Sequence, residues 1–350
     1  MRVMLAIEAR QHAECTAGME TVASARAFWI VEPGRGEIRD EPLAPAAAGE
    51  LLVRAEFSAI SRGTEALVFG GHVPRSEYTR MRAPFQAGEF PTPVKYGYCS
   101  VGVVEDGASE WLGARVFALY PHQTRYVIPQ TAAHVIPPEV PSGRAVLAAN
   151  METAVNGCWD ADPQRADRVT VIGAGTVGCL VAWVVRTTVG CDVELIDVNP
   201  QRTDIAERLG IRFVRGGPDD AGDAAQSERT IVIHTSGSEA GLRLALTLAA
   251  ADGTIVEMSW FGDREVTLPL GQAFHSRRLT IKSSQVGSIP PGRRDQWDYR
   301  RRMALALELL KDPVLDALIT GESVFADLPA VMPQLLRGPG NTLCHRIRYD

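Results

Sequence analysis

A glycine-rich loop stands near the middle of the chain, after a short apolar run over residues 169–172 and before a longer one. The loop reads Gly173-Ala174-Gly175-Thr176-Val177-Gly178. In an order of strand, loop and helix, the first glycine permits a tight turn, the second lets the backbone approach a pyrophosphate, and the third lets the helix pack closely on the strand. The N–H groups at the helix start, including those of Thr176 and Val177, would then face phosphate. The loop predicts a dinucleotide-binding unit; the alternative is a glycine turn without a ligand.

An acidic residue follows the loop at the distance that the dinucleotide motif requires. The next strand-like run ends at Asp197, about 20 residues beyond the loop. A carboxylate at this point binds the adenosine ribose 2′-hydroxyl, so the sequence favours NAD over NADP. Arg202 lies close by in the sequence and keeps NADP use open, although an exposed helix arginine is the plainer interpretation.

Strand-like and helical runs alternate after residue 141. The strand-like runs cover residues 168–172, 192–196, 211–214, 229–234, 254–258 and 279–283, with helical runs at 142–159, 177–188, 202–209 and 240–249. Alternating units of this length predict an α/β fold with a doubly wound parallel sheet of six strands and helices on both faces.

The chain before residue 141 has a different pattern. Short β-like runs cover residues 26–31, 50–60, 100–104, 115–118, 125–128 and 134–136, separated by glycine and proline turns. They predict an all-β domain. A helix over 294–310 and a strand-like end over 342–349 are too small for a third domain, so we expect them to return to the first. Residues 1–25 are expected to be a loose extension.

Composition and charge exclude several classes of function. The chain of 350 residues has 36 basic and 42 acidic residues, a net charge of −6, so no bulk positive field exists for nucleic acid or an anionic membrane. Its six cysteines are scattered and form no Cys-x-x-Cys pair, which argues against a disulfide scaffold. The start shows no secretory signal, and the longest apolar stretch is short for a membrane span. We therefore expect a cytoplasmic protein.

The domain order and three strings resemble the medium-chain dehydrogenase/reductase superfamily. The strings are Ser58-Ala59-Ile60-Ser61-Arg62-Gly63-Thr64-Glu65, Asn150-Met151-Glu152-Thr153 and Ser283-Ser284-Gln285-Val286-Gly287, and they look like its bacteriochlorophyllide a dehydrogenase-like branch. The resemblance implies a GroES-like catalytic domain over residues 26–145 and 288–350, with a Rossmann domain inserted over 146–287. It also implies an NAD(P)-dependent dehydrogenase that forms a homodimer.

The same resemblance shows that residues that bind zinc poorly stand at the positions of the catalytic zinc ligands. Zinc-using members carry a cysteine where this chain has Ser61, a histidine where it has Tyr98, and a cysteine or glutamate near Asn150. Serine, tyrosine and asparagine are poor zinc ligands. The four cysteines of the superfamily's structural zinc lobe are missing too, because no cysteine lies between residues 100 and 157. We therefore expect a zinc-independent member with no metal ligands.

Hydride transfer without zinc still needs a group that handles the hydroxyl proton. The resemblance puts three candidates near the reacting centre: Tyr98, Glu65 and Glu152. Each has a structural alternative. Tyr98 could be a core tyrosine whose hydroxyl has a hydrogen-bond partner. Glu65 could be a loop carboxylate that pairs with Arg62. Glu152 could be a carboxylate that stabilises a helix N-terminus.

Other residues take their expected roles from the resemblance. Arg62 is expected on the cofactor pyrophosphate, where a bidentate arginine is well suited, and Thr153 is expected to touch nicotinamide. Gly63 stands where many members carry a hydroxyl that relays protons. His122 is a further acid–base candidate, although a lone histidine in a β-domain is more often structural.

Together these features predict an NAD(P)-dependent oxidoreductase that interconverts a secondary alcohol and a ketone. The small-molecule substrate would lie in the cleft between the two domains. Two alternatives stay open: a zinc-less quinone or enoyl reductase acting on a conjugated C=C, and a non-enzymatic dinucleotide-binding protein. The substrate itself does not follow from the sequence.

Overall fold

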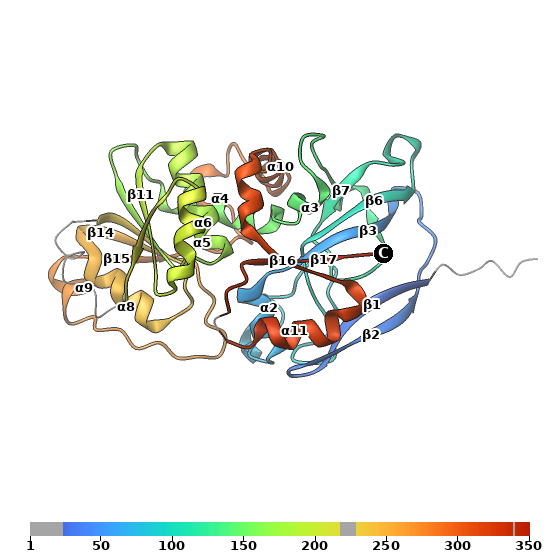
Figure 1. The fold of residues 1–350 in the computed structure, drawn as a ribbon, viewed down its shortest axis with the longest axis horizontal. Helices are drawn as coiled ribbons and strands as arrows, with labels where there is room; N and C mark the ends of the chain where they lie inside the picture. The colour runs from blue at the N-terminus through green and yellow to red at the C-terminus, as the bar shows by residue number, and fades with distance from the viewer. Residues whose placement is uncertain (1–23, 218–228, 339) are drawn as a thin grey trace, which may run out of the picture.

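The computed structural model describes residues 24–217, 229–338 and 340–350. The extension expected over residues 1–25 lies, but for its last two residues, outside this part of the chain. In Figure 1 a sheet with its helices fills the left half, the β-rich part fills the right half, and α10 (Tyr299–Leu309) stands between them.

A parallel sheet of six strands forms the left half within the described residues. Its strands, in order across the sheet, are β12 (Arg212–Arg215), β11 (Asp192–Asp197), β10 (Arg168–Ile172), β13 (Arg229–His234), β14 (Ala249–Glu257) and β15 (Thr280–Ser283). Neighbouring strands all run parallel, with Val169 opposite Val193 on one side and Ile231 on the other. The predicted doubly wound sheet is confirmed.

Helices cover both faces of this sheet because its central strands carry apolar side chains on both faces. Val171 and Leu195 belong to the core that packs against α4 (Ala148–Ala161) and α5 (Thr176–Val184). Ile172 and Val232 face the opposite way, into the core formed with α8 (Glu239–Leu248). Strands buried on both faces carry runs of valine, isoleucine and leucine, which is the pattern that the sequence showed.

Several boundaries differ from the predicted ones. The helix expected over 142–159 is divided into α3 (Ser142–Ala145) and α4. The helix expected to reach residue 188 ends at Val184 and continues as a π-helical turn over Val185–Val189. The hydroxyls of Thr187 and Thr188 donate to carbonyls of the preceding turn, which competes with regular α-helical pairing.

The β-rich half contains two sheets. One has the order β2-β1-β5-β4 and the other β16-β17-β3-β6-β7-β9, with β8 paired to β3. The bounds are β1 (Ser24–Glu32), β2 (Arg35–Pro42), β3 (Glu50–Ile60), β4 (Ala87–Gly88), β5 (Val94–Lys95), β6 (Ser100–Asp106), β7 (Arg115–Ala118), β8 (Arg125–Pro129) and β9 (His134–Val135). The prediction missed β2, because this largely polar edge strand has no apolar alternation.

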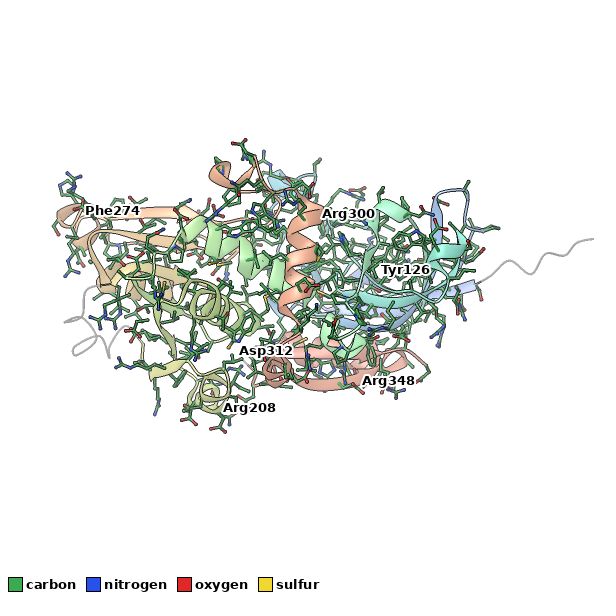
Figure 2. The ribbon with its side chains drawn as sticks, turned by 90° about the horizontal axis from the view of Figure 1, so that it is seen from above. Tyr126, Arg208, Phe274, Arg300, Asp312 and Arg348 are labelled. Atoms are coloured by element: carbon green, nitrogen blue, oxygen red, sulfur yellow. The ribbon has the colours of Figure 1, made fainter. Side chains whose placement is uncertain are left out.

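The C-terminal part of the chain returns to this half. After α10 come β16 (Ile319–Val324), α11 (Leu328–Leu336) and β17 (Cys344–Arg348), and β17 pairs antiparallel with β3, with Ile347 opposite Ser58. Figure 2 shows the helix that carries Arg300 between the half labelled at Phe274 and the half labelled at Tyr126. The helix predicted from residue 294 begins later because Asp298 caps its start, accepting the N–H of Arg301 at 2.7 Å.

Among the residues that the structure describes, no helix has the length and apolar character that a membrane span requires.

Candidate cofactor and active site

The glycine loop lies between β10 and α5, and each glycine meets a different constraint. Gly173 has φ of +106°, and a Cβ there would lie 2.7 Å from the backbone N of Ser236. A Cβ on Gly178 would lie 1.8 Å from the carbonyl oxygen of Gly173, so helix and strand pack too closely for any side chain. A Cβ on Gly175 would meet no atom within 4 Å. The loop therefore turns tightly, packs closely and leaves its middle glycine open to a ligand.

The carboxylate of Asp197 lies directly beside this loop. It ends β11 and accepts the N–H of Ala174 at 2.6 Å and that of Asn199 at 2.8 Å. Gly175 caps α5 without a side chain, so no side-chain cap competes for the N–H groups of Thr176 and Val177. Loop, helix start and acidic residue thus have the arrangement that fits a dinucleotide, with phosphate at the helix start and ribose at the carboxylate.

Arg62 and Arg202 both bind backbone carbonyls near the C-terminus, those of Gly338 and of residues 340–342. Arg62 donates to the carbonyls of Gly338 at 2.7 Å and Thr342 at 2.9 Å, whereas the buried Arg202 donates to that of Asn341 at 2.6 Å. Both guanidinium groups also reach the carbonyl of residue 340. Burial, and then the charge of Arg202, lowers the pKa of Arg62. The structure brings the two arginines together, and both donate hydrogen bonds to backbone carbonyls.

The three residues at the expected zinc positions also meet. Ser61 precedes α2 (Arg62–Phe69), Tyr98 lies between β5 and β6, and Asn150 lies on α4. The amide of Asn150 donates to Ser61 Oγ at 3.3 Å, and the side chain of Ser61 is the polar group that lowers the pKa of the Tyr98 phenol. Cys99 Sγ lies 3.9 Å from Asn150 Oδ1. Two loops of the β-rich half and helix α4 therefore build one polar cluster.

This cluster does not fit a zinc ion. Apart from the single thiol of Cys99, its members are neutral hydroxyl, phenol and amide groups, whereas a zinc site uses three or four thiolate, imidazole or carboxylate ligands. Across residues 24–217, 229–338 and 340–350, no group of three or more histidine, cysteine, aspartate or glutamate side chains is placed to hold a metal ion.

Tyr98 is a half-buried phenol whose ionisation is suppressed. Burial is the main cause that raises the pKa of Tyr98 well above its ordinary value, and the neighbouring Tyr96, Cys99 and Glu65 add to the effect. The hydrogen bond with Ser61 acts in the opposite direction. At neutral pH the phenol keeps its proton and can donate it.

Glu65 belongs to a buried chain of hydrogen bonds behind this cluster. One of its oxygens accepts the N–H of Ser61 at 2.7 Å, and the other lies 3.0 Å from His122 Nε2. The chain continues from His122 Nδ1 to Ser58 Oγ at 2.8 Å and from there to the hydroxyl of Tyr349 at 2.9 Å. Sequence reasoning missed Ser58 and Tyr349, because only the pairing of β17 with β3 brings them together.

Glu152 and Thr153 also lie on α4, and Glu152 faces away from Asn150. Glu152 is buried and accepts from Arg302 Nε at 3.1 Å, and burial raises its pKa although the arginine opposes that shift. Thr153 donates to the carbonyl of Ala149 at 2.9 Å. Helix residues two apart do not share a face, so the structure does not bring Glu152 together with Asn150 and its partners.

Comparisons with known proteins give distant relatives of one kind. No family model matches the chain. The chain is 26% identical over 228 residues to "Probable D-xylulose reductase A" of Arthroderma otae, covering 61% of this chain and 60% of that protein. It thus spans less than two thirds of the length of the curated relatives it matches.

Solved structures match over nearly the whole chain. L-idonate 5-dehydrogenase from Escherichia coli K-12 has a TM-score of 0.76 at 14% identity, covering 93% of this chain and 98% of that one. An alcohol dehydrogenase from Escherichia coli CFT073, solved with NADH, has a TM-score of 0.74 at 18% identity, covering 93% and 99%. With its β-rich half, its parallel six-stranded sheet and these neighbours, the chain has the GroES-like plus Rossmann fold of the medium-chain alcohol dehydrogenases.

Proposed function

We propose that this protein is an NAD(P)-dependent oxidoreductase that interconverts a secondary alcohol and a ketone without catalytic zinc. The observation that carries the proposal is the glycine loop, with Gly175 open to a ligand and Asp197 beside it. The relatives support it, because they are named as reductases and dehydrogenases of alcohols. Asp197 favours NAD, and the carbonyls that hold Arg202 leave that arginine less free for a 2′-phosphate.

The cofactor, when bound, supplies or accepts the hydride, and the chain's own residues manage the substrate oxygen. We assign proton donation to the hydroxyl of Tyr98, because a phenol is protonated at neutral pH and this one lies in the polar cluster with Ser61 and Asn150. In ketone reduction this proton goes to the oxygen as the carbon gains the hydride, and the reverse holds in oxidation. We assign to Ser61, which accepts a hydrogen bond from the amide of Asn150, the orientation of the Tyr98 hydroxyl.

Glu65 and His122 act behind Tyr98 rather than on the substrate. The carboxylate of Glu65 fixes the backbone N–H of Ser61 and contributes to the raised pKa of Tyr98. Glu152, paired with Arg302, is assigned to holding α4 against α10. Arg62 and Arg202 are assigned to holding the backbone of Gly338 and residues 340–342.

The first experiment measures NAD(H) and NADP(H) binding and tests a panel of polyols, vicinal diols and their ketones. Polyols lead the panel because the relatives are named for xylulose, idonate and butanediol. We expect turnover that falls about 100-fold in Tyr98→Phe with cofactor affinity retained. Turnover of enones alone would instead indicate a C=C reductase, and cofactor binding without turnover of any member would indicate a binding protein.

Metal analysis of the purified active protein tests the zinc-free part of the proposal. We expect full activity after treatment with a chelator and no stoichiometric zinc. One tightly bound zinc per chain whose removal abolishes turnover would contradict the proposal. The homodimer stays a prediction, to be checked by light scattering.

A further inference from the structure

A second buried polar cluster lies at the ends of β13 and β14, and the proposed chemistry does not use it. His234 ends β13 and Glu257 ends β14. His234 Nδ1 lies 2.6 Å from Glu257 Oε2, and His234 Nε2 lies 2.6 Å from Ser236 Oγ. The imidazole is fully buried, and the Glu257 side chain is 13% exposed. A titratable pair at this depth needs a reason beyond packing.

The hydrogen bonds in the cluster can all run in one direction. Ser238 Oγ accepts the N–H of Gly241 at 3.0 Å, which leaves its own hydroxyl to donate to Ser236 Oγ at 2.8 Å. Ser236 can then donate to His234 Nε2, and His234 Nδ1–H to Glu257. The other oxygen of Glu257 accepts the N–H of Ser259 at 2.6 Å. In this direction both oxygens of Glu257 accept hydrogen bonds, as those of a carboxylate do, and the imidazole donates from Nδ1 and accepts at Nε2.

The cluster lies where the second half of a dinucleotide would lie. Ligands of doubly wound sheets bind outside the carboxyl ends of the strands, and β13 adjoins β10 at the point where the strand order reverses. The backbone of Ser236 packs directly against Gly173 of the glycine loop. Asp197 marks the adenosine side, on β11. The ends of β13 and β14 therefore belong to the nicotinamide side.

We propose that the Glu257–His234 pair sets the preference of the site for the oxidation state of the cofactor. This inference rests on the proposed dinucleotide site. The oxidised nicotinamide ring is a cation and the reduced ring is neutral, so a buried carboxylate at this edge stabilises the oxidised form selectively. The pair is thus a specificity determinant rather than a proton carrier.

One positive group faces the cluster from the next loop. Arg264 donates to the carbonyl of Gly237 at 2.9 Å, and its guanidinium lies 5.5 Å from the centre of the Phe261 ring, which stacks on His234. Arg264 is exposed, so solvent screens its charge, whereas Glu257 is largely shielded from solvent. The carboxylate therefore dominates the local field.

The test measures Kd for oxidised and for reduced cofactor in the full chain, using fluorescence titration for the reduced form and competition for the oxidised form. In Glu257→Gln we expect the ratio of Kd(oxidised) to Kd(reduced) to rise about tenfold, the order of effect that one charge produces at intermediate dielectric. Glu257→Met removes the same charge and replaces the carboxylate with a side chain that does not form its hydrogen bonds. The ratio must rise in whichever of the two variants stays folded.

Two controls separate charge from structure. Asp252→Asn removes a negative charge from the same strand, five positions before Glu257, where the ion pair with Arg278 is exposed, and it should leave the ratio unchanged. His234→Gln disturbs the same hydrogen bonds but keeps the carboxylate, so the ratio should not rise. An unchanged ratio in folded Glu257→Gln would overturn the inference. Failure of the wild-type protein to bind either form would instead overturn the proposed function.

Discussion

The imidazole Nε2 of His122 lies 3.0 Å from Oε2 of Glu65, and neither side chain is more than 2% exposed. The other oxygen of Glu65 holds the backbone N–H of Ser61, whose side chain contacts Tyr98 and Asn150. A buried carboxylate at this place disfavours any further negative charge nearby. The relationship therefore links a chain of hydrogen bonds in the β-rich half to the protonation of the proposed proton donor.

Glu65→Gln should bring the pKa of Tyr98 down towards its ordinary value, because the nearby negative charge is lost while the side chain keeps its shape. The expected result is a high-pH limb of the rate profile that moves to lower pH. The ultraviolet change that accompanies tyrosine ionisation checks the same shift without substrate, with Tyr98→Phe as the blank.

The matched control for this variant is Glu105→Gln. Glu105 forms ion pairs with Arg54 and Arg125 on the surface of the same half. Neither partner belongs to the buried chain of hydrogen bonds that contains Glu65. Its replacement should leave the profile unchanged. Identical profiles for the wild type and Glu65→Gln would contradict the link between Glu65 and Tyr98.

The second and third glycines of the loop should separate folding from binding. Gly175→Ala places its Cβ in open space, so the fold should stay intact while the affinity for the dinucleotide falls about tenfold or more. Gly178→Ala drives its Cβ into the carbonyl of Gly173 and should cost about 1 to 3 kcal/mol of unfolding free energy.

Urea unfolding and cofactor titration check both variants, and Gly292→Ala, whose Cβ also meets no atom within 4 Å, is the control. Equal cofactor affinity in Gly175→Ala and Gly292→Ala would argue against the loop as the pyrophosphate site.

The sequence predicted the parallel sheet well because its signals are local. The glycines of the loop, the apolar strands such as β10 and the polar turns lie next to the elements that they specify. It failed for α11, in which Pro329 and Pro333 interrupt the helical pattern, and for β2, whose polar face gives no alternation. Tertiary contacts decide both elements.

The candidate site was only partly predictable, for a different reason. Resemblance pointed to Ser61, Tyr98 and Asn150, which the structure brings together. The buried chain could not be found, because its steps join residues 57, 64 and 291 positions apart. No spacing rule reaches across such separations, and His122 alone gave no hint of its partners.

Arg302 and Glu152 should be coupled in stability. Both are buried, and Arg302 also contacts Asn156 and the carbonyl of Val286. Arg302→Met leaves a buried carboxylate without its cation and should cost about 3 to 5 kcal/mol of unfolding free energy. The double variant with Glu152→Met should regain part of this loss. Urea unfolding of the four proteins gives the coupling, and strictly additive losses would mean that the pair does not act as a unit.

His134 should make the protein sensitive to mild acid. Burial, and then the charge of Arg300, lowers the pKa of His134 to about 4, against an ordinary value of about 6.5. Arg300 is held there because it donates to the carbonyl of Thr131 at 3.1 Å. Between these two pH values His134 is protonated in the unfolded chain and unprotonated in the folded chain. Stability therefore falls as pH drops from about 6.5 to about 4, by roughly 1 to 3 kcal/mol from this residue.

His134→Asn removes the titrating group, so its unfolding free energy should decline less than that of the wild type between pH 7 and pH 4. Urea unfolding at closely spaced pH values measures the difference between the two curves. His275→Asn, at an exposed histidine on α9 (Ala273–Ser276), should follow the wild-type curve. Parallel curves for His134→Asn and the wild type would show that the folded protein accepts the proton at His134 as readily as the unfolded chain does.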